Sequence, residues 1–251
     1  MTSVASLTGP SPQSTLQQEA TPTIPGVQAS HIHAPRKLRL LDLFCGEGGA
    51  GDGYARAGYD VTGVDIRPQP RYPHRFVCAD ALVYLREHGH EYDIIHASPP
   101  CRAHSQLRFL HSYRHYDFIP ETRRLLKASK KPYIIENVET APLRRPVILC
   151  GAMFGLRTYR HRLFETNIPI TQPRHPKHKF KVAPSNRSPY AWEYVIIAGH
   201  FGVTEEGRRI MDMPWATRDG LADAIPPAYT KYLGEQAAVA LRVLGYYDQL
   251  D

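Results

Sequence analysis

The chain has 251 residues, with 31 Lys and Arg against 24 Asp and Glu, a formal net charge of +7 and a pI near 9.2. No apolar run approaches the roughly 20 residues of a membrane span, and the N-terminus lacks a signal segment, so we expect a cytoplasmic protein. Its 4 cysteines are too few for a disulfide framework, and the positive charge suggests a polyanionic partner.

Residues 1–36 are predicted to form a disordered tail. They are rich in Pro, Ser, Thr and Gln and show no apolar periodicity. Burial would therefore not offset the entropy lost on ordering them, and we expect a solvated arm.

From Lys37 the pattern changes to short apolar strands that alternate with helices. This alternation predicts an α/β fold with a Rossmann-like, mostly parallel sheet flanked by helices, with residues 37–164 as the catalytic core. The predicted strands are residues 38–44, 61–64, 76–78, 92–97 and 133–135. The predicted helices are residues 54–57, 81–88 and about 115–130.

The second half of the chain is less regular. Further strands are predicted over residues 147–150, 163–166 and 195–198. The Pro-, Lys-, Arg- and His-rich stretch within residues 165–215 predicts a small basic lobe. Residues 216–251 should return to the core, with an amphipathic helix over residues 228–244.

The first strand runs into a glycine-rich turn over residues 42–49, where backbone N–H groups could hold an anionic ligand. The alternative is a tight strand-to-helix turn. Asp65 and Asp80 end the next two strands, where ligands gather in parallel sheets. An acid at such a position either binds ribose hydroxyls or caps a helix.

The segment Ser98-Pro99-Pro100-Cys101 follows a buried strand. Two prolines fix a rigid turn that would present the Cys101 thiol at the edge of the sheet. Arg102 and His104 are near enough in sequence to lower the pKa of this thiol, as a nucleophile requires. The alternative is an inert buried thiol.

Glu136-Asn137-Val138 ends the fifth strand, where a partly buried carboxyl could act as an acid. Arg160 and Arg162 are two residues apart and would share a face of a strand. The alternative for the arginines is a solvated basic turn.

We expect no metal site. His111 and His115 have helical spacing, but no Cys pair or acid is spaced to complete a site with them. His175 and His178 lie in a Lys- and Pro-rich loop, and Cys150 reads as an inert thiol.

Together these motifs resemble those of cytosine-5 DNA methyltransferases, in the family's order and over residues 38–244. The motif at residues 42–49 looks like the S-adenosylmethionine loop, and Pro99-Pro100-Cys101 looks like the nucleophile motif. Glu136-Asn137-Val138 looks like the base-binding motif, Arg160 and Arg162 like the paired arginines, and residues 224–227 like the last motif, which returns to the cofactor.

The resemblance implies methyl transfer from S-adenosylmethionine to carbon 5 of a cytosine extruded from double-stranded DNA, through a covalent Cys101 adduct. Catalysis would use Cys101, Glu136, Arg160 and Arg162. Cofactor contacts would come from Asp42, Phe44, Cys45, Gly46, Gly48, Gly49, Asp65, Ile66, Asp80, Pro99 and Ile225. Substrate contacts would come from Ser98, Pro100, Arg102, Asn137 and Val138.

Two residues depart from the family pattern: Arg102 and Thr158 stand where glutamine is usual. The short lobe predicts a short or loosely specified target, and the enzyme would fit a restriction-modification role. A monomer without an obligate protein partner is expected. The same chemistry on RNA or a free cytosine nucleotide is an alternative, as is a catalytically silent DNA-binding module.

The charge is uneven along the chain. Residues 157–187 carry eight Lys or Arg against one acid, and residues 102–131 carry eight against two. Both stretches adjoin the predicted site, which favours a polymeric nucleic acid as the partner and predicts salt-sensitive binding. Two independent solvated faces would be the alternative.

Overall fold

The computed structural model describes residues 36–104, 116–184, 189–199 and 201–245. By its internal contacts the chain divides into Met1–Arg36 and Lys37–Asp251. The first unit is described only at Arg36, so the predicted tail lies outside the described residues, as do His111 and His115. The division into core, lobe and returning segment stays a prediction.

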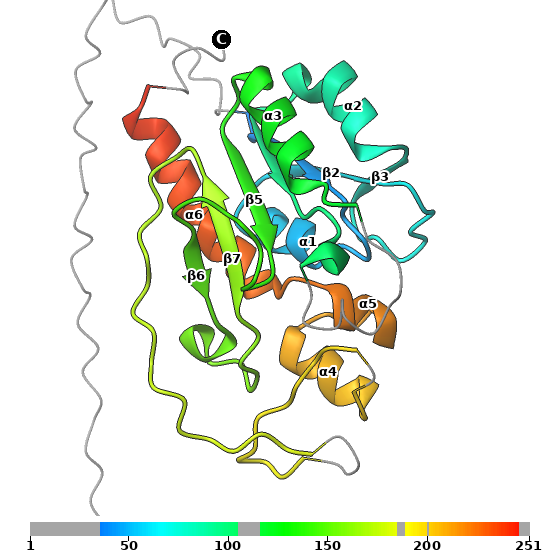
Figure 1. Cartoon of the computed structure of the whole chain (residues 1–251), viewed down its shortest axis with the longest axis vertical. Coiled ribbons are helices and arrows are strands. Elements are labelled where there is room, and N and C mark those ends of the chain that lie inside the picture. The colour runs from blue at the N-terminus through cyan, green and yellow to red at the C-terminus, as the bar shows by residue number, and fades with distance from the viewer. Residues whose placement is uncertain (1–35, 105–115, 185–188, 200, 246–251) are drawn as a thin grey trace, which may run out of the picture. The chain divides into compact units, whose positions relative to one another are not determined.

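A seven-stranded sheet in the order β3-β2-β1-β4-β5-β7-β6 forms the centre of the second unit (Figure 1). The pairs from β3 to β5 are parallel, whereas β7 is antiparallel to both β5 and β6. This confirms the mostly parallel α/β fold. The strands are β1 (Arg39–Leu43), β2 (Asp60–Asp65), β3 (Arg75–Cys78), β4 (Ile94–Ala97), β5 (Tyr133–Asn137), β6 (Val147–Leu149) and β7 (Arg162–Thr166).

Helices cover both faces of the sheet, and consecutive strand residues supply the two cores. Leu40 packs in the cluster that contains residues of α1 and α6, whereas Leu41 packs in the cluster of α2 and α3. This follows from the alternation of side chains along a strand. The helices are α1 (Gly49–Arg56), α2 (Ala81–His88), α3 (Ile119–Ser129), α4 (Thr204–Met211), α5 (Arg218–Asp223) and α6 (Pro227–Val243).

The predicted elements of the first half are confirmed. Helix α1 begins earlier than predicted, and its N-terminal half was missed because that half is rich in glycine and alanine. The strand predicted over residues 195–198 is wrong. Only an isolated bridge between Val182 and Tyr194 forms there. Ile197 is instead buried in a third apolar cluster with Phe201 and residues of α4 and α5.

Helices α4 and α5 were not predicted, because they are short and mostly polar. In Figure 1 they lie beyond the end of β5, where the parallel strands finish. They therefore bring residues after 200 to the edge of the sheet that carries the predicted site. Among the helices that the structure describes, none combines the length and apolar character needed to cross a lipid bilayer.

Candidate active site

The glycine turn after β1 is held by the acid that ends β2. Gly46 has φ +49° and Gly48 has φ +90°, both in the left-handed region that favours glycine. The Gly46 N–H donates to Asp65 Oδ2 at 3.1 Å, and the Arg67 N–H donates to Asp65 Oδ1 at 3.0 Å. Asp65 therefore fixes the turn at the carboxyl ends of the two strands.

Asp42 lies beneath this turn, completely buried. Its Oδ2 accepts from the hydroxyl of Tyr72 at 3.1 Å. Burial raises the pKa of Asp42 to about 7, against the opposing effects of Tyr72 and His74. Cys45 is also buried, and desolvation raises the pKa of its thiol. Both side chains support the turn from below, and their predicted contacts with cofactor stay predictions.

The segment before α6 packs against the start of α1. A Cβ placed on Gly49 would lie 2.3 Å from the Ile225 carbonyl oxygen, so only glycine allows this approach. Glu47 accepts from the Thr217 N–H at 2.7 Å and from the Thr217 hydroxyl at 2.6 Å. The last motif therefore does return to the glycine turn, and Glu47 is an anchor that the sequence analysis did not identify.

The remaining predicted cofactor residues lie along the same edge. Ile66 follows β2 and is 69 % exposed, which is unusual for an isoleucine and leaves its side chain available to a ring. Asp80 caps α2, since its Oδ1 accepts from the N–H groups of Leu82 and Val83, each at 2.9 Å. Phe44, at φ 58°, is half-buried and packs near Phe118.

Cys101 begins a short 3-10 helix directly after Pro100 and is partly exposed. Burial raises the pKa of its thiol, and the Glu136 carboxylate adds to this effect, whereas Arg162 lowers the pKa. The expectation that Arg102 and His104 activate the thiol is therefore corrected: Arg162 is the cation that acts on it. Arg102 points to solvent, and His104 pairs with Asp117 at 2.9 Å.

Glu136 lies near the end of β5, the neighbour of the strand β4 that leads into the Cys101 turn. Its carboxylate is buried and pairs with Arg162, whose Nε lies 3.0 Å from Oε1. Burial raises the pKa of Glu136, and the two arginines and the Ser98 hydroxyl lower it. The ion pair of Glu136 and Arg162 thus lies within electrostatic range of the Cys101 thiol.

Glu136 is the last member of a chain of hydrogen-bonded polar groups. The Tyr54 hydroxyl lies 3.0 Å from His96 Nδ1, and His96 Nε2 lies 2.8 Å from the Ser98 hydroxyl, which in turn bonds Glu136. Burial lowers the pKa of His96 to about 3, so its ring is neutral at physiological pH. Tyr54 and His96 were missed because nothing in their spacing marks them.

Asn137 holds the nucleophile turn in place. Its Nδ2 donates to the Pro99 carbonyl at 2.8 Å, and its Oδ1 accepts from the Val138 N–H at 3.0 Å. The Asn137 side chain therefore hydrogen-bonds to the loop that carries Pro100 and Cys101. A direct contact between Asn137 and substrate stays a prediction.

The expectation that Arg160 and Arg162 share a strand face is wrong, because β7 begins at Arg162. Arg160 is buried, and its guanidinium donates to the carbonyl oxygens of Ala222, Ala224 and Ile197, with the Ala222 bond at 2.6 Å. Arg160 therefore ties α5 and the third cluster to the core, while Arg162 faces the thiol and carboxyl.

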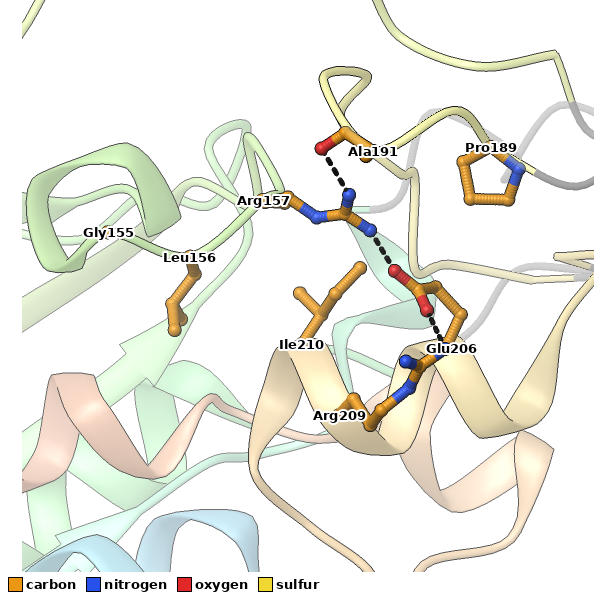
Figure 2. A pocket seen from close by; sticks show the side chains of 8 residues that line it. All are labelled: Gly155, Leu156, Arg157, Pro189, Ala191, Glu206, Arg209 and Ile210. Atoms are coloured by element: carbon orange, nitrogen blue, oxygen red, sulfur yellow. Dashed lines mark hydrogen bonds and ion pairs between the residues drawn. The ribbon is translucent and has the colours of Figure 1, made fainter.

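A surface pocket of about 530 Å³ lies away from these residues (Figure 2). Arg157 crosses it to the Ala191 carbonyl at 2.6 Å and to the Glu206 carboxylate, which also pairs with Arg209. None of the predicted site residues lines this pocket. It belongs to the packing of α4 against the preceding loop.

A second group of reactive side chains meets outside the candidate site. Cys150, His161, His175 and His178 each offer a ligand atom, and these atoms all lie within 4.8 Å of one another. The sequence analysis did not foresee this cluster, since it treated Cys150 as inert and His175 and His178 as loop residues. The spacings Cys-x10-His and His-x2-His were its signal.

No family model matches the chain, and no curated protein matches it significantly. Solved structures match in fold. A DNA modification methyltransferase encoded within an Escherichia coli prophage has a TM-score of 0.58 and 14% identity, covering 82% of this chain and 100% of that one. The Dnmt2 methyltransferase of S. pombe has a TM-score of 0.52 and 13% identity, covering 83% and 99%. The chain therefore has a methyltransferase fold.

Proposed function

We propose that this protein transfers a methyl group from S-adenosylmethionine to carbon 5 of cytosine in double-stranded DNA. The observation that carries the proposal is that the Cys101 thiol, just after β4, lies within electrostatic range of the buried Glu136–Arg162 ion pair at the ends of the neighbouring strands β5 and β7. This trio supplies a nucleophile, an acid and a fixed cation. The two similar structures, one described as a DNA modification methyltransferase, support the same reaction class.

The residues around the glycine turn suit the proposed cofactor. Gly46 and Gly48 keep the backbone open to close approach, and the exposed Ile66 would pack on an adenine ring. Asp65 and Asp80 lie at strand ends where nucleoside hydroxyl and amino groups bind in such sheets. S-adenosylmethionine bound here would supply an electrophilic methyl group.

Glu136 would serve both base recognition and nucleophile activation. Burial, which raises the pKa of Glu136, would help its carboxylate to take up a proton when an extruded cytosine binds, and the carboxyl would then donate to ring nitrogen 3. Protonation also removes the negative charge that raises the pKa of Cys101. Substrate binding would therefore favour the thiolate at the moment that the ring is polarised.

The Cys101 thiolate would then add to ring carbon 6. The π electron pair of the carbon 5–carbon 6 double bond would become available at carbon 5, which would take the methyl group as its bond to the cofactor sulfur breaks and S-adenosylhomocysteine leaves. Removal of the carbon 5 proton by a base would re-form the ring double bond and expel Cys101. Arg162 would stabilise the negative charge that develops on the ring, because it is held beside both residues.

Duplex DNA is favoured over a free nucleotide because basic residues flank the site. The stretches at residues 102–131 and 157–187 together carry 16 Lys or Arg. A single nucleotide would need far fewer cations, whereas each phosphate contact strengthens binding to a polymer. Affinity for DNA should therefore fall steeply as salt increases.

Methyl transfer from tritium-labelled cofactor to duplex DNA, RNA and deoxycytidine monophosphate, run in parallel, tests the proposal. We expect label in duplex DNA at carbon 5 of cytosine. Label in RNA or in the free nucleotide alone would replace the DNA assignment. Label on the exocyclic amine, or in none of the three, would contradict the chemistry.

A further inference from the structure

The cluster of Cys150, His161, His175 and His178 has the composition of a closed transition-metal site. The Nε2 atoms of His161 and His175 are 3.0 Å apart, and Cys150 Sγ lies 3.4 Å from His178 Nε2. Ligand atoms around a tetrahedral zinc ion are separated by roughly 3.4–3.6 Å, given bonds of about 2.0–2.3 Å. These two spacings are near those of a four-coordinate site, and small side-chain shifts would bring in the other pairs, which all lie within 4.8 Å.

The fold brings the first two of these residues together. In the antiparallel register of β6 and β7, Leu149 lies opposite Arg162. Cys150 and His161 are the next residues on the two strands and therefore lie across the same end of the hairpin. Cys150 is fully buried, which protects its sulfur from solvent.

The other two residues come from a segment that has no core of its own. Between residues 169 and 184 no described side chain is buried. Arg174, Lys177, Lys179 and Lys181 add four positive charges with no acid among them. Something other than apolar packing must hold such a segment against the hairpin.

Neighbouring groups hold the imidazoles in place. The His178 ring stacks on Tyr159, with centroids 3.7 Å apart, and the Glu139 carboxylate lies 3.7 Å from His161 Nδ1. A carboxylate on the second ring nitrogen orients a ligating histidine and makes it a better donor. Gln172 docks the segment further, by hydrogen bonds of 2.7 and 2.8 Å to the backbone of Ile148.

We infer that these four side chains bind one Zn²⁺ ion through a thiolate and three imidazoles. With four protein ligands the site is closed, so the ion has a structural role. The ion would cross-link the β6–β7 hairpin to residues 169–184, the basic segment. It would hold this segment close to Arg162, which follows His161 in the sequence. The basic segment would thereby be placed next to the candidate active site.

Metal content of the tag-free full chain tests this inference without any assay of activity. We expect about one zinc ion per chain by mass spectrometry of the metal, as for a structural site. His178→Ala should lose the ion, and its exposed position makes misfolding a poor explanation for the loss. Cobalt in place of zinc should show thiolate-to-metal charge transfer that Cys150→Ser abolishes.

Two matched controls separate this site from adventitious binding. His90→Ala removes an exposed histidine outside the cluster and should keep the zinc. Replacing His31 and His33 together tests the N-terminal histidines and should also leave the content unchanged. A wild-type chain that does not retain zinc against a chelating dye, or a His178→Ala chain with full content, would overturn the inference.

Discussion

The Nε atom of Arg162 lies 3.0 Å from Glu136 Oε1, and the two charges act in opposite directions on the pKa of the Cys101 thiol. The two side chains come from adjacent antiparallel strands, β5 and β7, so the sheet itself sets their separation. Arg160 makes no such contact, because its guanidinium is bonded to backbone carbonyls. Two arginines that look equivalent in the sequence therefore have different roles.

Arg162→Lys should slow methyl transfer. Lysine keeps the charge but not the planar Nε donor, and a hydrogen bond to a charged group is worth about 1.5–3 kcal/mol, or roughly 10–100-fold in rate. Single-turnover methylation measures this. Arg124→Lys is the control, because its pair with Glu121 is exposed and should not matter. Equal rates in both variants would remove Arg162 from the mechanism.

Ser98→Ala should reduce the rate of methyl transfer. The Ser98 hydroxyl links His96 to Glu136, so the substitution removes one hydrogen bond to the Glu136 carboxyl. We expect a loss of about tenfold, near the value of one hydrogen bond to a charged group. Ser129→Ala, at the end of α3, serves as the control. An unchanged rate in Ser98→Ala would mean that Glu136 does not depend on this chain of groups.

Gly49→Ala should destabilise the protein and abolish cofactor binding. The added Cβ would meet the Ile225 carbonyl at 2.3 Å, and overpacking of this kind costs about 1–3 kcal/mol. Gly58→Ala controls for destabilisation alone: its φ of +99° strains an alanine there, but no atom lies within 4 Å of the added Cβ, so the glycine turn keeps its contacts. Calorimetry should show S-adenosylmethionine binding to Gly58→Ala only. Binding to Gly49→Ala with wild-type affinity would contradict the role of this contact.

Asp42 should make stability depend on pH. Its pKa is raised from 3.8 to about 7, so the folded state binds more protons than the unfolded chain between those values. The contribution of Asp42 to stability is therefore complete below pH 3.8 and is lost as pH rises, by up to about 1.4 kcal/mol per pH unit until pH 7. Denaturant unfolding from pH 5 to 8 should show the stability of the wild type falling relative to that of Asp42→Asn, since His96 and the other shifted groups are common to both proteins. Parallel curves would contradict it.

Much of the fold follows from local patterns. Pairs such as Ile94-Ile95 and Ile134-Ile135 predict strands buried on both faces, and they fill the two cores as expected. Residues 195–198 carry the same apolar character, but in the part of the chain that the structure describes no strand pairs with them. Helix α4 was missed for the opposite reason: only its last two residues are strongly apolar.

Residues of the candidate site could be predicted where they follow the end of a strand. They could not be predicted where contacts with distant parts of the chain determine the position of the side chain. Cys101 and Glu136 lie at neighbouring strand ends, as their motifs indicate. The position of the Arg160 guanidinium is set by carbonyl oxygens of residues more than thirty positions away in the sequence, and no local pattern reveals these partners. The same is true of Cys150 and His178, which meet only because the basic segment folds back over the hairpin.

Covalent trapping tests the central claim most directly. Duplex DNA containing 5-fluorocytosine cannot lose its carbon 5 substituent, so the Cys101 adduct should persist through denaturation when S-adenosylmethionine is present. We expect peptide mapping to place the DNA on Cys101, with Cys101→Ser giving no adduct and Cys78→Ser, which changes an exposed thiol outside the site, giving wild-type yield. Methylation of ordinary DNA without any trapped adduct, or an adduct in Cys101→Ser, would contradict the account.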